Sequence, residues 1–346
     1  MFYWSAHKAF LVAKRFAVFK HTQKGNAIKS LIFFAIIFYL GKIFDPYNQG
    51  QLSVVLIYFI AILSITFLTG LSGQISLGQG ALMAVGGYTC ALVILNLGLT
   101  YWQSIIIAVV ASLIAGWILG ITAARLSGPY LAGTTLVIAL AIPSLATRFE
   151  SVFGGDVGLS VDFGNPPEWL SGTIGEIGYE QWQLFAALPF ATIALYLALN
   201  LFKSRTGRSW RAVRDHEIAA SLTGVNVQRI KIFTFVVASG FAGLAGAMYG
   251  LRGIVGPSVY PVSLSLALLT GAVLGGLRSI AGAFMGAALV VFLPDLIEKI
   301  TGSWELAPQI GNYLPAMVAG VLLILTVVLN PAGIAGALHH HKPRHK

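Results

Sequence analysis

Long apolar runs separated by short polar breaks dominate the pattern of this chain. About 20 consecutive apolar residues suffice to cross roughly 30 Å of hydrocarbon as an α-helix. Ten runs meet or approach that length, and they lie at about 28–44, 52–69, 75–95, 103–126, 130–149, 182–202, 232–251, 262–277, 280–297 and 313–329. The pattern predicts an all-α polytopic membrane protein with eight to ten membrane-spanning helices and a transmembrane domain over 28–330.

Two stretches fit this pattern less well. The 262–277 run is short, and the 70–87 region is rich in glycine. Each can form a re-entrant or broken helix instead of a full crossing, because irregular backbone at membrane depth is tolerated where it is buried in protein or lines a wet cavity. These alternatives set the lower limit of eight spans.

Composition supports a membrane location. Of the 346 residues, 57% are hydrophobic and only 10% are charged. No soluble domain of ordinary size fits between the apolar runs. The single cysteine, Cys90, lies in an apolar run, so an intramolecular disulfide is impossible. The net charge of +10 alone would suit nucleic acid, but the placement of the charges gives a simpler explanation.

The basic residues are divided unequally between the two sides of this topology. One side holds 18 of the 22 Lys and Arg residues, which lie in 1–29, 203–231 and 331–346 and at Arg125 and Arg278. The other side receives 10 of the 12 acids. The positive-inside rule then predicts cytoplasmic termini, with 1–27 as a basic amphipathic segment on the lipid surface and 331–346 as a basic cytoplasmic tail.

The longest loop on the acidic side, at 150–181, carries six of those acids and several glycine and proline turn signals. Two interpretations remain open. The loop is either solvated chain or a docking surface for an extracytoplasmic partner.

A polar, basic segment at 207–231 interrupts the apolar spans and must lie in water. Arg208, Arg211 and Arg214 recur at every third position and would share one helix face. The small residues Ala219, Ala220 and Gly224 would let another protein approach closely, with Ala220 and Gly224 four residues apart on one face. The alternative is a basic loop that only orients the neighbouring helices.

A second polar stretch, at 69–80, lies between two spans. Its glycines alternate with polar side chains, which include Ser72, Gln74, Ser76 and Gln79. Small residues and interhelical hydrogen bonds can explain such a stretch by packing alone. The other interpretation is that these side chains line a wet path.

Several ordered motifs resemble the LivM-like permeases of branched-chain amino acid ABC importers. The string at 73–78, Gly-Gln-Ile-Ser-Leu-Gly, matches a signature of that family, and the 211–226 segment resembles its ATPase coupling loop. Further matches lie at 84–88, 128–136, 241–247 and 275–287, so the resemblance spans about residues 50 to 330. The chain departs from the family pattern at Arg278, Ala283 and Ile218.

The resemblance implies a permease subunit in the bacterial inner membrane that carries leucine, isoleucine and valine. Its implied partners are a homologous LivH-like permease, two ABC ATPase subunits and an extracytoplasmic solute-binding protein. The residues assigned to the substrate path are Ser72, Gln74, Ser76, Gln79, Thr134 and Thr135. Those assigned to ATPase coupling are Arg208, Arg211, Arg214, Ala219, Ala220 and Gly224.

Urea, short amides and other amino acids are the alternative substrates. An ion-coupled secondary transporter is the alternative mechanism, but such carriers usually keep a carboxylate near the membrane midplane, and here Asp295 and Glu298 lie at a span end. The sequence contains no Gly-x4-Gly-Lys-Ser/Thr string, so ATP hydrolysis would require a separate subunit.

Enzymatic chemistry is not expected. A nucleophilic serine needs a base, and all seven histidines lie in the tails or in the 207–231 segment. We therefore expect no cofactor and no metal site, and interpret His339, His340, His341 and His345 as part of a solvated tail.

Overall fold

The computed structural model describes residues 2–126, 128–166, 177–301 and 333–340, together with single positions between 314 and 324. Eight helices in this part of the chain are long and apolar enough to cross a membrane. They are α1 (Phe2–Ile43), α2 (Pro46–Ile65) with its π-helical extension η1 (Thr66–Leu71), α3 (Gln79–Leu97), α4 (Tyr101–Ala123), α5 (Pro129–Arg148), α8 (Tyr179–Lys203), α11 (Val227–Gly250) and α13 (Ile280–Thr301).

These eight helices confirm the predicted all-helical class at the lower limit of the predicted range. The short run at 262–277 forms α12 (Val262–Gly275), whose 14 residues extend only about 21 Å at 1.5 Å per residue. This helix is too short to cross the hydrocarbon by itself. The tenth run, 313–329, lies mostly outside the described residues.

Helix α1 runs without a break from Phe2 to Ile43. The predicted surface segment at 1–27 and the first span therefore belong to one helix. Only Gln23–Ile43 has the composition of a membrane span. Attachment of the preceding residues to the lipid surface stays a prediction.

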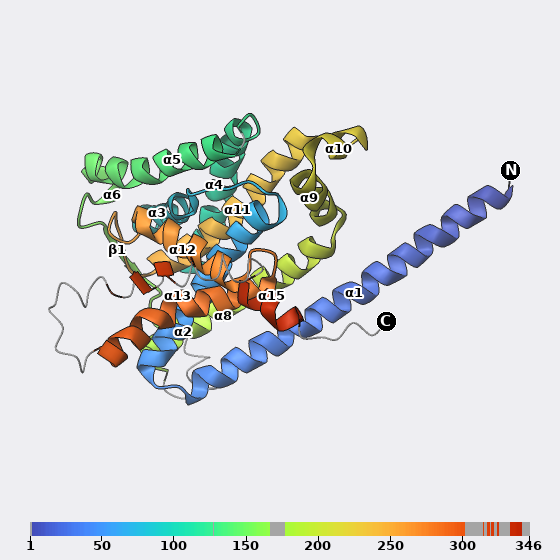
Figure 1. Ribbon diagram of the computed structural model, residues 1–346. Helices are drawn as coiled ribbons and strands as arrows, with labels where there is room; N and C mark the ends of the chain where they lie inside the picture. Colours follow the sequence, from blue (N-terminus) through green and yellow to red (C-terminus); the bar gives the residue numbers. More distant parts are fainter. Residues whose placement is uncertain are drawn as a thin grey trace.

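Helix α2 lies at the centre of the bundle. Within the protein, 89% of its most apolar window is buried, against 22% for α5. It packs against α8, α11 and α13, while α11 in turn packs along α3 and α4 (Figure 1). These contacts explain why α2 is apolar on every side, as expected of a helix with no lipid-facing stripe.

Glycines allow the closest helix contacts. A Cβ atom added at Gly86 would collide with the backbone of Gly243, and one added at Gly275 would collide with the backbone of Gly282. The first pair joins α3 to α11 and the second joins α12 to α13. Small residues thus let both helix pairs approach closely.

In the described part of the chain, two short strands form the regular structure outside the helices. The strands β1 (Leu159–Asp162) and β2 (Arg252–Val255) pair antiparallel, with Leu159 opposite Val255. Strand β1 comes from the predicted 150–181 loop, after the four-residue helix α6 (Glu150–Phe153), and β2 directly follows α11. The pairing fixes part of this loop against the end of the bundle.

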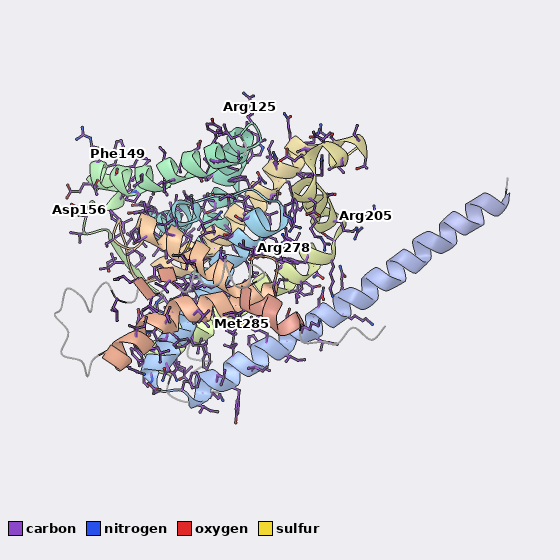
Figure 2. The ribbon with its side chains drawn as sticks, in the orientation of Figure 1. Arg125, Phe149, Asp156, Arg205, Arg278 and Met285 are labelled. Atoms are coloured by element: carbon purple, nitrogen blue, oxygen red, sulfur yellow. The ribbon has the colours of Figure 1, made fainter. Side chains whose placement is uncertain are left out.

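Charged residues separate along the bundle. Figure 2 shows Phe149 and Asp156 at one end, while Arg205 and Arg278 lie toward the other. We call the end that carries Arg205 the basic end. The helices α9 (Arg205–Asp215) and α10 (Glu217–Leu222) project there (Figure 1). The remaining described helix is α15 (Gly333–His340).

Candidate functional site

The helix α2–η1 ends at Leu71, and α3 begins only at Gln79. We call residues 72–78 the broken segment. Gly73 takes a left-handed backbone conformation with φ +73°, which favours glycine at this position. Beyond it the chain is irregular, as the glycine-rich sequence predicted. The broken segment is held in part by side chains, since the Leu77 amide donates a 3.0 Å hydrogen bond to Thr135 Oγ1 of α5.

The structure brings five of the six predicted path residues together at the broken segment. The side chains of Ser72, Gln74, Ser76, Gln79 and Thr135 are all buried. Gln74 Nε2 donates to Ser72 Oγ at 2.8 Å, and Ser64 Oγ donates to Gln79 Oε1 at 3.0 Å. Thr134 differs, because it is half-buried and donates to the Tyr130 carbonyl of its own helix.

Two of these amides keep a buried polar atom without a protein partner. Gln74 Oε1 and Gln79 Nε2 are the atoms concerned, among the side chains that the structure describes. An unpaired buried amide group is unfavourable by about 1–3 kcal/mol. Such groups are typical of positions that meet water or a polar ligand. Their place in a path stays a prediction.

The predicted coupling segment folds as two short helices. Ser204 caps α9, and its hydroxyl accepts a 3.0 Å hydrogen bond from the Gly207 amide. His216 is extended, with φ −163°, and separates α9 from α10, where its Nδ1 accepts from the Ala219 amide. Helix α10 ends at Leu222, and Gly224 beyond it has φ +87°. The predicted helix face shared by Ala220 and Gly224 is therefore wrong.

Helix α10 presents apolar side chains to the outside. Ile218 is 68% exposed and Leu222 is 83% exposed, and they lie four residues apart on one face. We call this pair the α10 patch. Ala220 is instead 4% exposed and packs against its own chain, while Ala219 is exposed. The sequence argument missed Ile218 and Leu222, although their helical spacing beside small residues was a usable signal.

The three predicted coupling arginines contact their own chain. Arg208 Nη1 donates to the Lys203 carbonyl at 3.2 Å, and Arg211 Nη2 donates to the Phe202 carbonyl at 3.2 Å. Both therefore satisfy carbonyls that the end of α8 leaves unpaired. The opposite side of α9 buries Trp210.

Arg214 reaches the membrane part of the protein. Its Nη1 donates a 2.6 Å hydrogen bond to the carbonyl of Gly70, beside the broken segment. Its Nη2 also donates to Asp215 Oδ1 at 2.7 Å, and this hydrogen bond lowers the pKa of the Asp215 carboxyl below its ordinary value.

Glu217, at the start of α10, forms an ion pair with Lys231 of α11. Glu217 Oε1 lies 2.7 Å from Lys231 Nζ, and the Lys231 side chain is only 7% exposed. A buried ammonium group requires such a partner. The pair therefore fixes α10 to the first turn of α11.

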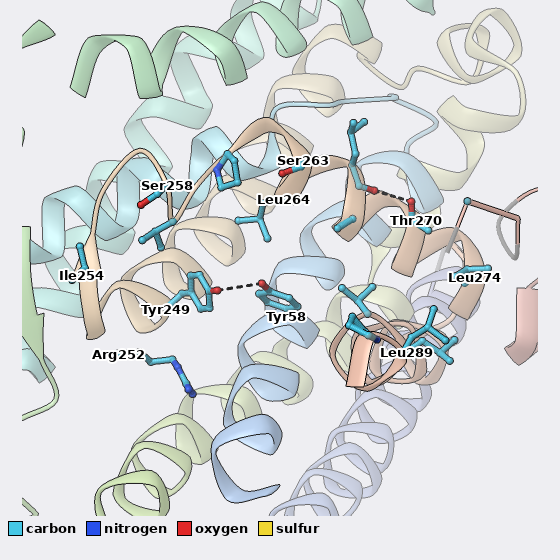
Figure 3. A pocket seen from close by; sticks show the side chains of 18 of the residues that line it. Tyr58, Tyr249, Arg252, Ile254, Ser258, Ser263, Leu264, Thr270, Leu274 and Leu289 are labelled. Atoms are coloured by element: carbon cyan, nitrogen blue, oxygen red, sulfur yellow. Dashed lines mark hydrogen bonds between the residues drawn. The ribbon is translucent and has the colours of Figure 1, made fainter. Parts of the chain in front are cut away.

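A pocket of about 1170 Å³ lies beside α12 (Figure 3). It is lined by residues of α2, α11, β2, α12 and α13 and of the loop between β2 and α12, including Tyr58, Tyr249, Arg252, Ser258, Thr270 and Leu289. Helix α12 lies between the pocket and the first turn of α3, which follows the broken segment, because Ser265 on α12 is not part of the pocket lining and accepts a 2.9 Å hydrogen bond from the Gly80 amide. Sequence reasoning did not identify this pocket. The sequence marks only one of its residues as unusual: Arg252 is a basic residue on the side of the predicted topology that holds most of the acids.

Comparison with known proteins decides the family. Residues 49–327 match the family described as "Branched-chain amino acid transport system / permease component". The chain belongs to this family. The predicted family is thereby confirmed, and the permease is a non-catalytic membrane component, as predicted. The role of the 211–226 segment as a coupling loop stays a prediction.

Named relatives share a quarter or more of the sequence with the permease. The high-affinity branched-chain amino acid transport system permease protein LivM of Escherichia coli K12 is 29% identical, over 90% of this chain and 76% of its own length. LivH of the same strain is 25% identical, over 87% of this chain and 96% of its own length. BraD of Pseudomonas aeruginosa is 28% identical, over 81% of this chain and 91% of its own length.

Proposed function

We propose that the permease forms the translocation path of an ATP-driven importer for branched-chain amino acids in the inner membrane of a bacterium. Its termini and the basic end would face the cytoplasm, as the distribution of Lys and Arg predicts. Membership of the permease family and the names of its relatives support this proposal. The observation that carries it is the α10 patch at the basic end, joined through Arg214 to the broken segment.

The α10 patch supports docking of an ATPase subunit. Exposed apolar side chains on a charged, water-facing helix pair are typical of a protein interface. A short helix that lies in a groove of its partner would bury Ile218 and Leu222 together. Because the sequence has no phosphate-binding loop motif, the partner must supply ATP hydrolysis. We infer two such ATPase subunits, one for each permease.

The remaining partners follow from the same assignment. A homologous permease would complete the path, and an extracytoplasmic solute-binding protein would deliver the substrate at the end of the bundle that carries β1 and β2. Ser72, Gln74, Ser76, Gln79 and Thr135 would line the path at the broken segment, with Thr134 beside them. The two unpaired amide atoms of Gln74 and Gln79 support this placement.

Uptake tests the proposed substrate directly. We would measure entry of radiolabelled leucine and of radiolabelled urea in a strain that lacks only this subunit and in the same strain after restoration of the gene. Leucine uptake should depend on the gene, and urea uptake should not. Gene-dependent urea uptake without leucine uptake would overturn the branched-chain assignment. Uptake that survives depletion of ATP but not of the ion gradient would instead favour an ion-coupled carrier.

A further inference from the structure

The pocket beside α12 has a polar end and an apolar end. Figure 3 shows Arg252, Tyr249 and Ser258 toward one end and Leu274 and Leu289 toward the other. Its volume of about 1170 Å³ lies slightly above the usual range for small-molecule sites, about 300–1,000 Å³. The pocket therefore has room for a small amphipathic solute.

Arg252 at the polar end is a cation with incomplete pairing. Its Nη1 donates to the Gly50 carbonyl at 3.2 Å and also contacts Ser53 Oγ. The nearest carboxylate is that of Glu180, whose Oε2 lies 4.0 Å from Arg252 Nη2. This separation is too long for a hydrogen bond. Glu180 Oε2 is also buried without a hydrogen-bond partner in the described structure.

Among the described residues, Nη2 and Nε of Arg252 donate no hydrogen bond, and Nη2 forms only the long ion pair with Glu180. Arginine binds carboxylates through two parallel hydrogen bonds, and these charge-assisted bonds are stronger than neutral ones. The ion pair between Arg252 and Glu180 is long, so a partly buried arginine of this kind is suited to receive a second carboxylate from a ligand.

Two tyrosines adjoin Arg252 at the same end. Tyr58 and Tyr249 have ring centroids 5.6 Å apart, and the Tyr58 hydroxyl donates a 3.4 Å hydrogen bond to the Tyr249 hydroxyl. Both side chains line the pocket. Aromatic faces and phenol oxygens attract an ammonium group. The polar end therefore carries partners for both charges of a zwitterion.

The opposite end offers only weak polar groups. Leu274 and Leu289 line it, and the nearby Thr270 hydroxyl already donates to the Leu266 carbonyl (Figure 3). Such a lining favours a branched apolar side chain and gives no partner to a charged one.

We propose that this pocket is a binding site for a free apolar amino acid, in which Arg252 holds the carboxylate and the α12–α13 end holds the side chain. The proposal rests on the proposed function, because it names where this permease would hold the transported solute. It adds a recognition site at a distance from the broken segment, with α12 between them.

Protection of an introduced cysteine tests this site. Ala267→Cys places a thiol in the pocket lining, while the native Cys90 is buried. The complete complex in lipid nanodiscs, without binding protein, is treated with N-ethylmaleimide and increasing L-leucine. Leucine should slow alkylation, and isoamylamine, which lacks the carboxylate, should not. Adding Arg252→Met should raise the half-protecting leucine concentration about ten-fold or more, as expected for a lost charge-assisted pair.

Two matched variants serve as controls. Arg148→Met removes the same charge from an exposed position at the same end of the bundle, and protection should not change. A cysteine at Val157, which is 82% exposed between α6 and β1, should be alkylated equally with and without leucine. The leucine and isoamylamine comparison needs no change at Arg252, so it stays informative if Arg252→Met does not assemble.

Equal protection by isoamylamine, or unchanged protection in Arg252→Met, would overturn the site. Gene-dependent leucine uptake distinguishes this failure from failure of the proposed function. If uptake is present and protection is absent, only the amino acid site is wrong. If leucine uptake is absent, the proposed function is overturned as well.

Discussion

Arg214 of α9 donates a 2.6 Å hydrogen bond to the carbonyl oxygen of Gly70, beside the broken segment. A polar helix at the basic end thereby contacts the irregular backbone stretch between α2 and α3. The Gly73 backbone also lies against the Arg214 side chain, with no space for a Cβ atom between them. Movement of α9 would therefore be passed directly to residues around Gln74.

Loss of this contact should uncouple transport from ATP hydrolysis. Hydrogen bonds to charged groups contribute about 1.5–3 kcal/mol, so Arg214→Gln should lower leucine uptake per ATP hydrolysed about ten-fold. Arg208→Gln is the matched control, because Arg208 bonds only to the end of α8. Leucine uptake per ATP hydrolysed would be measured for both variants in proteoliposomes. A similar loss in both variants would contradict a specific role for Arg214.

The α10 patch should determine ATPase docking. Leu222→Asp places a charge at the most exposed apolar position of α10 and should release the ATPase during detergent purification, while the permease still inserts normally. Val157→Asp makes the same change at an 82% exposed valine at the other end of the bundle. The ATPase should stay bound in that control. Full co-purification with Leu222→Asp would show that the patch faces lipid or solvent.

The Glu217–Lys231 pair should stabilise the fold. Glu217→Gln leaves the buried Lys231 ammonium without its carboxylate, which should lower the free energy of unfolding by about 1–3 kcal/mol. Combining Glu217→Gln with Lys231→Met should recover most of that loss, because no unpaired charge remains buried. Thermal unfolding of the two single variants and the double variant gives the coupling energy. If the losses of the two single variants simply add in the double variant, the ion pair contributes little to the free energy of unfolding.

Accessibility to a thiol reagent tests the sidedness. Val157→Cys should react with an impermeant maleimide added to intact cells, and Ser221→Cys should react only after permeabilisation. Both positions lie in exposed parts of the structure, and the native Cys90 is buried. The opposite labelling pattern would place the basic end outside and invert the topology.

Hydropathy along the sequence was sufficient to predict the spans, because a membrane helix requires a long apolar run whatever its neighbours are. The irregular stretch around Gln74 was also predictable, since glycine and polar residues are concentrated there. Four of the six candidate path residues, Ser72, Gln74, Ser76 and Gln79, proved to be neighbours for the same reason. The fifth neighbour, Thr135, was proposed through the family resemblance and not through any local pattern.

Features that depend on tertiary contacts were not predictable. Nothing in the sequence marks His216 as the extended residue that separates α9 from α10, and this break turns Ala220 inward and Leu222 outward. The pocket is built from five separate elements, so no local pattern reveals it. Arg252 was visible only as a basic residue on the acidic side.

Transport by the purified complex tests whether this permease belongs to an ATP-driven importer of leucine. The permease, its partner permease and the ATPase subunits would be reconstituted in liposomes, with binding protein and labelled leucine on the side that carries Val157 and ATP on the side that carries Leu222. We expect ATP-dependent leucine accumulation that Leu222→Asp abolishes and Val157→Asp retains. Leucine accumulation without ATP, or its persistence in Leu222→Asp, would contradict this expectation.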